Sequence, residues 1–131
     1  MDYDSLSGEE WRRLLQEHPE HAPHCDWRKL NGWLWCHLLK KQPQLHIYCN
    51  WEKLSSWYLA TVLREHPQLA IHCDWRRLTR WDWVYLLHKQ PQFAQRIPLE
   101  LLPEVQLDAA LDMNPNCEEL RDAILLQALL N

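Results

Sequence analysis

Several residue types that build particular kinds of structure are scarce in this chain of 131 residues. It has only 2 glycines, and a chain so poor in glycine cannot easily form phosphate-binding loops or many tight β-hairpins. Its 5 cysteines include no C-x-x-C pair, and its first ten residues are acidic where a secretion signal has a basic segment. These absences exclude nucleotide-binding and all-β folds and predict a reduced, cytoplasmic protein.

Long hydrophobic runs are also missing. The most apolar stretch, residues 123–130, is interrupted by Gln127 and is far shorter than the roughly 20 residues of a membrane-spanning helix. We therefore expect no membrane span. The balance of 47% hydrophobic and 24% charged residues is typical of a globular protein, and the length predicts one domain covering residues 1–131.

A 24-residue period dominates the sequence. Columns of proline, leucine, tryptophan and cysteine recur together with this spacing, which is the signature of a repeat protein. The units of such a protein bury a continuous core only by stacking on one another. The proline column consists of Pro19, Pro43, Pro67, Pro91 and Pro115.

The period predicts an all-α fold, a short helical-repeat solenoid of about five 24-residue units. Each unit is expected to contain an α-helix, a 3₁₀ turn and a second short helix, over residues 7–30, 31–54, 55–78, 79–102 and 103–131. The last unit is degenerate, and residues 99–131 hold seven acids against one base. We expect it to form an acidic C-terminal cap that stops further stacking, with Asn116 capping a helix of residues 117–130.

Polar side chains recur where each first helix is expected to begin, and Glu10 and Asp82 add capping-box character in two units. These N-caps are Ser7, Asn31, Ser55 and Thr79. Each helix is expected to end just before its proline. The W-x-x-L segments that follow predict inward-facing pairs, namely Trp27 with Leu30, Trp51 with Leu54 and Trp75 with Leu78.

The segments WLWCHLLKKQPQLHIYCNWEKL and WDWVYLLHKQPQFAQRI carry a resemblance to a known repeat. They resemble an uncharacterised 24-residue tryptophan-rich repeat found in tandem in large bacterial proteins, over about residues 9–97. In period and layout the chain is also similar to the leucine-rich repeat variant, an array that alternates α and 3₁₀ helices. The resemblance implies a non-enzymatic interaction scaffold and no catalytic residues.

The outward side of the first helices is the most informative predicted surface. Its residues vary between units and mix aromatic and aliphatic side chains with charge, as protein interfaces do. The predicted protein-binding residues are Leu34, His37, Tyr58, Thr61, Asp82 and Tyr85, with Lys41, Glu65 and Lys89 on the same face. Trp33, Trp57 and Trp81 flank this face, and their recurrence favours a role in covering junctions between repeats over contact with a partner.

A basic ridge on the second helices is the alternative binding surface. Such a ridge can hold a phosphate backbone, although Glu52 interrupts it and the formal net charge of the chain is −4. Its predicted nucleic-acid-binding residues are Arg28, Lys29, Lys53, Arg76, Arg77 and Arg80.

Metal binding and catalysis have weaker signatures. His18, His21, His24 and Cys25 form a metal-like cluster, but structural zinc usually takes its ligands from two separated pairs. The adjacent His24–Cys25 and His72–Cys73 pairs suggest an activated thiol, yet Tyr48–Cys49 occupies the same column, which favours packing. We predict no catalytic residue, metal or cofactor, and a Cys/His enzyme or zinc protein is the third alternative.

These observations predict a non-enzymatic module that binds another protein by stoichiometric contact, as an inhibitor or adaptor. Because a compact acidic protein can occupy the basic groove of a nucleic-acid enzyme, a bacterial or phage inhibitor of such an enzyme is the concrete version. The apolar end of the last helix predicts either burial against the previous unit or a homodimer surface. Nucleic acid is the less favoured partner.

Overall fold

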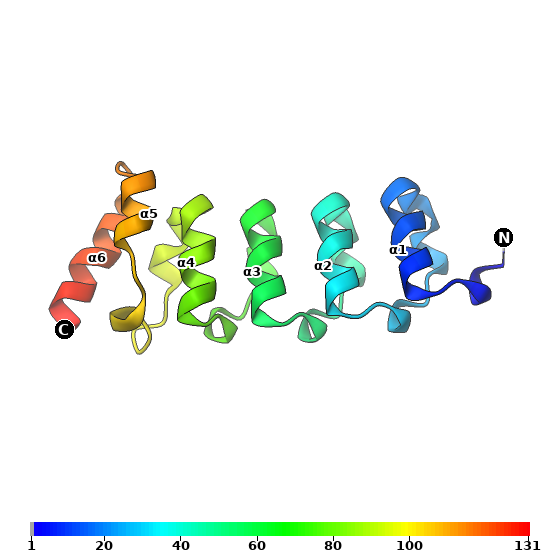
Figure 1. Ribbon diagram of the computed structural model, residues 1–131, viewed down its shortest axis with the longest axis horizontal. Coiled ribbons are helices and arrows are strands. Elements are labelled where there is room, and N and C mark those ends of the chain that lie inside the picture. Colours follow the sequence, from blue (N-terminus) through cyan, green and yellow to red (C-terminus); the bar gives the residue numbers. More distant parts are fainter. Residues whose placement is uncertain (1) are drawn as a thin grey trace. The chain divides into compact units, whose positions relative to one another are not determined.

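The computed structural model describes residues 2–131, which form α-helices and 3₁₀ segments and contain no strand (Figure 1). The all-α prediction is therefore confirmed. The chain divides into two compact units, Met1–His72 and Cys73–Asn131, and the division falls inside the third predicted repeat. Among the described residues, no helix combines the length and apolar character needed to cross a membrane.

Four ten-residue helices begin 24 residues apart, as the repeat predicts. They are α1 (Gly8–Glu17), α2 (Gly32–Lys41), α3 (Ser56–Glu65) and α4 (Arg80–Lys89). Each predicted N-cap side chain accepts a hydrogen bond from the main-chain N–H three residues on, and both predicted capping boxes are present. Each helix ends directly before the residue that precedes its proline, so the expected helix boundaries are confirmed.

The chain returns from each helix through 3₁₀ segments. Six-residue segments start at the prolines, namely η2 (Pro19–His24), η4 (Pro43–Tyr48), η6 (Pro67–His72) and η8 (Pro91–Arg96). The W-x-x-L segments form single three-residue turns, η3 (Trp27–Lys29), η5 (Trp51–Lys53) and η7 (Trp75–Arg77). The expected second short helix is thus one 3₁₀ turn, because the backbone is already extended at the following leucine.

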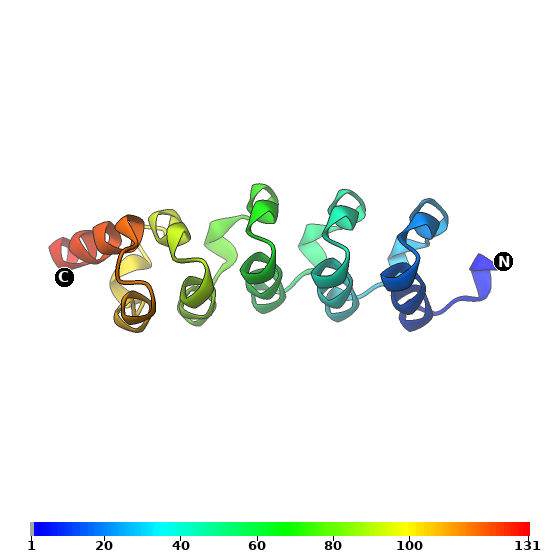
Figure 2. The ribbon, with the colours of Figure 1, turned by 90° about the horizontal axis from the view of Figure 1, so that it is seen from above.

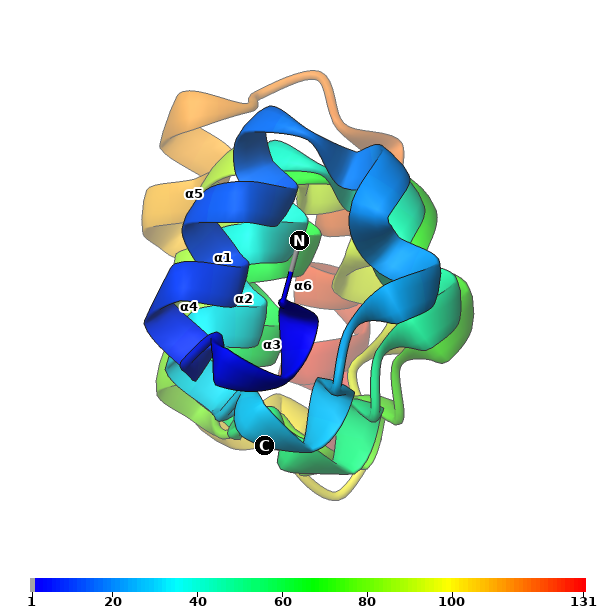
Figure 3. The ribbon, with the colours of Figure 1, turned by 90° about the vertical axis from the view of Figure 1, so that its right-hand side faces the viewer.

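In the first unit, α1, α2 and α3 form one layer and η2, η4 and η6 form a second (Figures 2 and 3). Helix α1 packs on α2, and α2 packs on α3. The apolar core lies between the layers and is contributed by every repeat of this unit. Its fully buried side chains include Trp11, Leu15, Leu30, Trp35, Leu38, Leu39, Leu54, Leu59 and Leu63.

The W-x-x-L tryptophans are only half-buried, whereas Leu30, Leu54 and Leu78 are buried as predicted. Trp27 lies between two other aromatic rings, with its centroid 5.0 Å from that of Trp35 and 4.8 Å from that of Tyr48. Each of these indoles thus lies against aromatic rings beside the core and keeps part of its own surface open. The prediction that these tryptophans face inward is therefore wrong in part.

The repeat starts earlier than residue 7. Asp2 caps the 3₁₀ turn η1 (Tyr3–Ser5) as Asp26 caps η3. Tyr3 stacks on Trp11 at 5.5 Å and on His24 at 4.7 Å, as Trp27 does on the equivalent rings one repeat later. The segment Asp2–Leu6 is thus the end of a partial repeat that covers the first ring stack.

The second unit departs from the repeat after η8. It continues through η9 (Leu102–Glu104) and α5 (Asp108–Met113) to α6 (Glu118–Leu130), which packs against η8. The predicted C-terminal helix is present, but Cys117 occupies its N-cap position and its side chain accepts no capping hydrogen bond, so the Asn116 cap is wrong. Leu120 and Ala123 are buried, whereas Leu125, Leu126, Leu129 and Leu130 are exposed. Burial of the apolar helix end is therefore incomplete.

Candidate functional site

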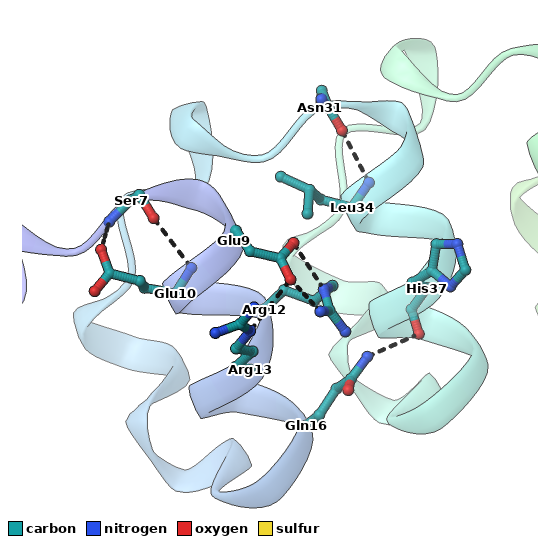
Figure 4. Close-up of polar contacts among 9 residues, drawn as sticks. All are labelled: Ser7, Glu9, Glu10, Arg12, Arg13, Gln16, Asn31, Leu34 and His37. Carbon is teal, nitrogen blue, oxygen red and sulfur yellow. Dashed lines mark hydrogen bonds and ion pairs between the residues drawn. The ribbon is translucent and has the colours of Figure 1, made fainter.

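Polar contacts between α1 and α2 position the outer helix face of the first unit (Figure 4). The Gln16 side-chain amide donates to the main-chain carbonyl of His37 across 3.5 Å. In return, Gln42 Nε2 donates to the Gln16 carbonyl at 2.8 Å. Both bonds are accepted by main-chain carbonyls, so they fix the register of α1 against α2. The His37 ring takes no part in them and can contact other side chains.

Glu9 gathers two arginines on the same face. Its carboxylate forms an ion pair with Arg12, including an Arg12 Nε–Glu9 Oε2 distance of 3.1 Å, and lies 3.3 Å from Arg13 Nε. The bond from Arg12 and the positive charges lower the pKa of Glu9 below its usual value. The paired Arg12 guanidinium lies 5.9 Å from the ring centroid of Trp33 on α2, within cation–π distance.

Two tryptophans on neighbouring helices are the main apolar feature of this face. Trp33 on α2 is 44% exposed and Trp57 on α3 is 48% exposed. The His37 ring lies 4.2 Å from the Trp33 ring, and the Thr61 hydroxyl donates to the Trp57 carbonyl at 2.8 Å. The indoles therefore present wide surfaces to solvent beside a half-buried histidine and threonine.

The structure places the predicted protein-binding residues in different environments. His37, Tyr58, Thr61 and Tyr85 are half-buried, while Lys41, Glu65 and Lys89 are exposed. Tyr58 covers the start of α2, where its Cδ2 would lie 3.3 Å from a Cβ atom added to Gly32. The Tyr58 carbonyl also accepts a weak bond from Cys36 Sγ at 3.9 Å.

Leu34 and Asp82 are not on the accessible face, so their assignment as binding residues is wrong. Leu34 is 7% exposed and packs against Gly8 of the preceding helix. Asp82 is 3% exposed, and its Oδ2 accepts the Thr79 main-chain N–H at 2.8 Å. Trp33 and Trp57 are each exposed over nearly half of their surface, and the idea that they mainly cover junctions between repeats stays a prediction.

Most of the basic ridge is occupied by intramolecular contacts. Arg28 is paired with Asp26, with Nε 3.0 Å from Oδ1. Lys29 Nζ donates to the carbonyls of Asp4 and Leu6 at 3.0 and 2.7 Å. Lys53 Nζ makes the equivalent contact to the Leu30 carbonyl at 3.4 Å. In the first unit Lys29 and Lys53 therefore hold their W-x-x-L turns against the equivalent segment of the preceding repeat, while Arg28 is paired within its own turn.

In the second unit the remaining ridge residues lie in different surroundings. The Arg80 guanidinium lies 4.9 Å from the ring centroid of Trp81, which is exposed. Arg76 and Arg96 line a cavity of about 430 Å³ together with Asp74 and Glu100, so the charges of this cavity balance. Arg77 is half-buried.

The histidine cluster is organised by rings and hydrogen bonds. Tyr3 Oη lies 2.9 Å from His21 Nδ1, and His24 stacks on the Tyr3 ring. His18 Nδ1 is 3.3 Å from a carboxylate oxygen of Glu20. Within residues 2–131, no three histidine, cysteine or acidic side chains are grouped so as to hold a metal ion.

The column cysteines are poorly suited to act as nucleophiles. Burial raises the pKa values of Cys25, Cys49 and Cys73 to about 12. Because the thiolate is the reactive form, these groups stay protonated at neutral pH. In the third repeat, His72 directly precedes the column cysteine Cys73. The His72 ring is hydrogen-bonded through Nε2 to His46 Nδ1 at 2.8 Å, and it stacks on the Trp51 ring at 4.6 Å.

One exposed feature was missed by sequence reasoning. Ile47 and Ile71 occupy the same repeat position on η4 and η6, and both are largely exposed. The equivalent residues are Pro23 and Gln95. The 24-residue alignment therefore shows that the fold does not require an aliphatic side chain at this position, and that is the signal by which the two isoleucines could have been found.

A scan against protein-family models, a search of curated proteins and a search of solved structures each found no match. The resemblance to the tryptophan-rich repeat therefore stays a prediction.

Proposed function

We propose that this chain is a non-enzymatic protein-interaction module that binds its partner through the outer face of its α-helices. The observation that carries the proposal is the pair of nearly half-exposed indoles, Trp33 and Trp57, on packed neighbouring helices. Tryptophan is the side chain most enriched among the residues that dominate binding energy in protein interfaces. We call the surface formed by Trp33, His37, Trp57 and Thr61 the tryptophan face.

The repeat itself supplies an internal comparison. Glu9 occupies in α1 the position that Trp33 and Trp57 occupy in α2 and α3, and α1 forms with the same length and cap. The fold therefore does not require an aromatic ring at this position. A large apolar side chain that is exposed without a structural need supports a role in contacting a partner.

The tryptophan face is also fixed before binding. The Gln16 bond to the His37 carbonyl and the Arg12 contact with Trp33 tie the face to α1. A preorganised surface loses less conformational freedom on association, so more of the contact energy appears as affinity. Exposed acids at Glu100, Glu104, Asp108, Asp112, Glu118 and Asp122 support the narrower prediction of an inhibitor that occupies a basic groove.

Site-specific photo-crosslinking in the native cell tests the proposal. A benzophenone amino acid placed at Trp33 or Trp57 should crosslink one and the same protein, whereas the probe at exposed Glu52 on η5 should not. With that protein purified, Trp33→Gln with Trp57→Gln should weaken binding by about 30-fold or more, as measured by calorimetry. Glu52→Gln serves as the matched control.

Two results would overturn the proposal. One is equal crosslinking from positions 33, 57 and 52. The other is full affinity of the double tryptophan variant for the crosslinked protein, with a melting temperature that shows the variant is folded.

A further inference from the structure

The last helix exposes a group of neighbouring leucines. Leu125 and Leu129 on α6 are 66% and 82% exposed, and Leu126 and Leu130 are exposed as well. Residues three or four positions apart lie side by side on a helix, so these four side chains form one stripe over the last turns of α6. Leu99, which precedes η9, is also exposed.

A groove of about 280 Å³ joins Leu99 to this stripe, because Leu99 and Leu126 both line it. Its other apolar lining residues are buried, namely Ala94, Ile97, Leu102 and Ala123. The groove therefore has an apolar floor and exposed leucines at its rim. A continuous apolar surface with a groove in it is typical of an interaction site. We call this surface the leucine patch, and its exposed members are Leu99, Leu125, Leu126, Leu129 and Leu130.

The acids of α6 give one edge of the groove a negative charge. Asp122 is the one charged side chain in the lining, and it is exposed. Glu118, one turn earlier on the same helix, is exposed too. Within residues 2–131, neither carboxylate takes part in an ion pair. Both charges are therefore available to a cation on a partner.

The nearest arginines in the sequence do not neutralise this edge. Arg121 falls about 140° round the α6 axis from Leu126, because successive residues of a helix are about 100° apart. It thus lies on another side of α6 from the groove. Arg96 lines the separate cavity that also contains Asp74 and Glu100.

The composition of α6 adds to the negative potential. Its first turn contains Glu118 and Glu119, and its last turn contains no basic residue. The final carbonyl groups of a helix carry a partial negative charge that nearby cations stabilise. A cation is therefore favoured beside the last leucines of α6 as well as beside Asp122.

We propose that the leucine patch binds an amphipathic helix of a partner protein whose apolar stripe is flanked by lysine or arginine. One aliphatic side chain of this helix enters the groove above Ile97, and those one turn away pack on Leu125 and Leu129. Its flanking cations face Glu118 and Asp122. A helix fits because its side chains recur at the same three- and four-residue spacing as the leucines of α6.

A second copy of this chain is a poorer occupant. Residues 99–131 hold seven acids against one base, so two copies joined through α6 would bring like charges together, which opposes association. The leucine patch lies in the second unit, whereas Trp33 and Trp57 lie in the first. The proposal therefore does not depend on the tryptophan face.

Fluorescence polarisation at pH 7.5 tests the affinity, in about 0.15 M salt so that exposed charges are partly screened. The probe is a labelled, capped 18-residue peptide with leucine at positions i, i+3, i+4 and i+7 of each stripe and lysine elsewhere. One matched peptide carries glutamate in place of lysine. A second has the composition of the probe in a scrambled order that forms no apolar stripe.

The lysine probe should bind at least tenfold more tightly than either matched peptide. Leu126→Gln with Leu129→Gln should weaken this binding at least tenfold, and Asp122→Asn should weaken it several-fold. Because these side chains are exposed, the variants should keep the helical circular dichroism spectrum of the unchanged chain. Met113→Gln and Asp112→Asn, at exposed positions of α5 outside the groove lining, are the matched controls and should bind normally.

Methyl-detected NMR locates the bound probe. The chain has four isoleucines, of which Ile97 lines the groove while Ile47 and Ile71 lie in the first unit. The probe should shift the Ile97 δ1-methyl signal and leave those of Ile47 and Ile71 in place. Trp33→Gln with Trp57→Gln should bind the probe as the unchanged chain does, which separates this proposal from that for the tryptophan face.

Four outcomes would overturn the proposal. The probe could leave the Ile97 signal unmoved, or the scrambled peptide could bind equally well, which would indicate attraction by charge alone. The two α5 controls could lose as much affinity as the leucine variant. Alternatively, the chain could sediment as a dimer without peptide and become a monomer on Leu126→Gln with Leu129→Gln, which would identify a second copy as the occupant.

Discussion

At the residue scale, the two glycines mark places where backbones approach closely. Neither has a positive φ, so their role is not conformational. A Cβ atom at Gly32 would lie 2.7 Å from the Lys53 carbonyl oxygen and 3.3 Å from Tyr58 Cδ2. Gly8 stands in the same relation to the Lys29 carbonyl. The absence of a side chain thus lets the W-x-x-L turns η3 and η5 sit on the starts of α1 and α2.

We therefore expect Gly32→Ala to destabilise the protein, although alanine is the better helix former. Helix propensity alone predicts a gain of up to about 1 kcal/mol. The clash with a main-chain carbonyl should reverse it and leave a loss of about 1 to 2 kcal/mol. Urea unfolding measures the difference, with exposed Glu52→Ala as a control, and increased stability of Gly32→Ala would contradict the close approach.

His72 predicts a pH dependence of stability. Burial and the neighbouring His46 hold the pKa of His72 below its ordinary value of 6.5. The folded protein therefore binds a proton at this ring less readily than the unfolded chain does. The contribution of His72 to the free energy of unfolding should be fully present above pH 6.5 and should decrease as the pH falls below that value.

Urea unfolding at pH 7.5 and 5.5 should show a smaller loss of stability on acidification in His72→Gln than in the unchanged chain. Gln95→Ala, at an exposed position that carries no titratable group, is the control and should keep the full loss. An identical pH dependence in all three proteins would show that His72 does not titrate differently on folding.

At the element scale, helix boundaries could be predicted from single residues because caps and prolines act locally. Ser7, Asn31, Ser55 and Thr79 cap their helices as expected. Which outward positions remain open could not be predicted in the same way. Leu34 is covered by its contact with Gly8 on another helix, and helical periodicity within one segment carries no record of such a neighbour.

Asp82 was predicted both as part of a helix cap, from the local capping pattern, and as a binding residue, from its outward position on the helix. Its burial and its bond to the Thr79 N–H assign it to the cap. Asp82→Ala should therefore lower stability by about 1 to 2 kcal/mol, the usual cost of a lost cap. The measurement is thermal unfolding, and Asp112→Ala, at an exposed acid in α5, is the comparison.

Asp82→Ala should bind the purified partner with the same affinity as the unchanged chain does. A selective loss of binding with an unaltered melting temperature would return Asp82 to the interface.

At the scale of the whole molecule, leucines are exposed on α6, and self-association of the chain through this helix stays a prediction. Leu125 and Leu129 point to solvent on the last helix, beyond its buried Leu120 and Ala123. If a second copy covers these leucines, the unchanged chain should sediment as a dimer. Leu125→Glu with Leu129→Glu should then sediment as a monomer and keep its helical circular dichroism spectrum. A monomer at every concentration of the unchanged chain would contradict a homodimer.

The sequence by itself determined the 24-residue period, the all-α class, the helix boundaries and the caps, because each depends on residues only a few positions apart. Only the tertiary structure decided that Leu34 and Asp82 are covered, that Lys29 and Lys53 are engaged with main-chain carbonyls, and that Ile47 and Ile71 are exposed. Exposure depends on which side chains other repeats bring alongside a position, and neither spacing nor composition records those neighbours.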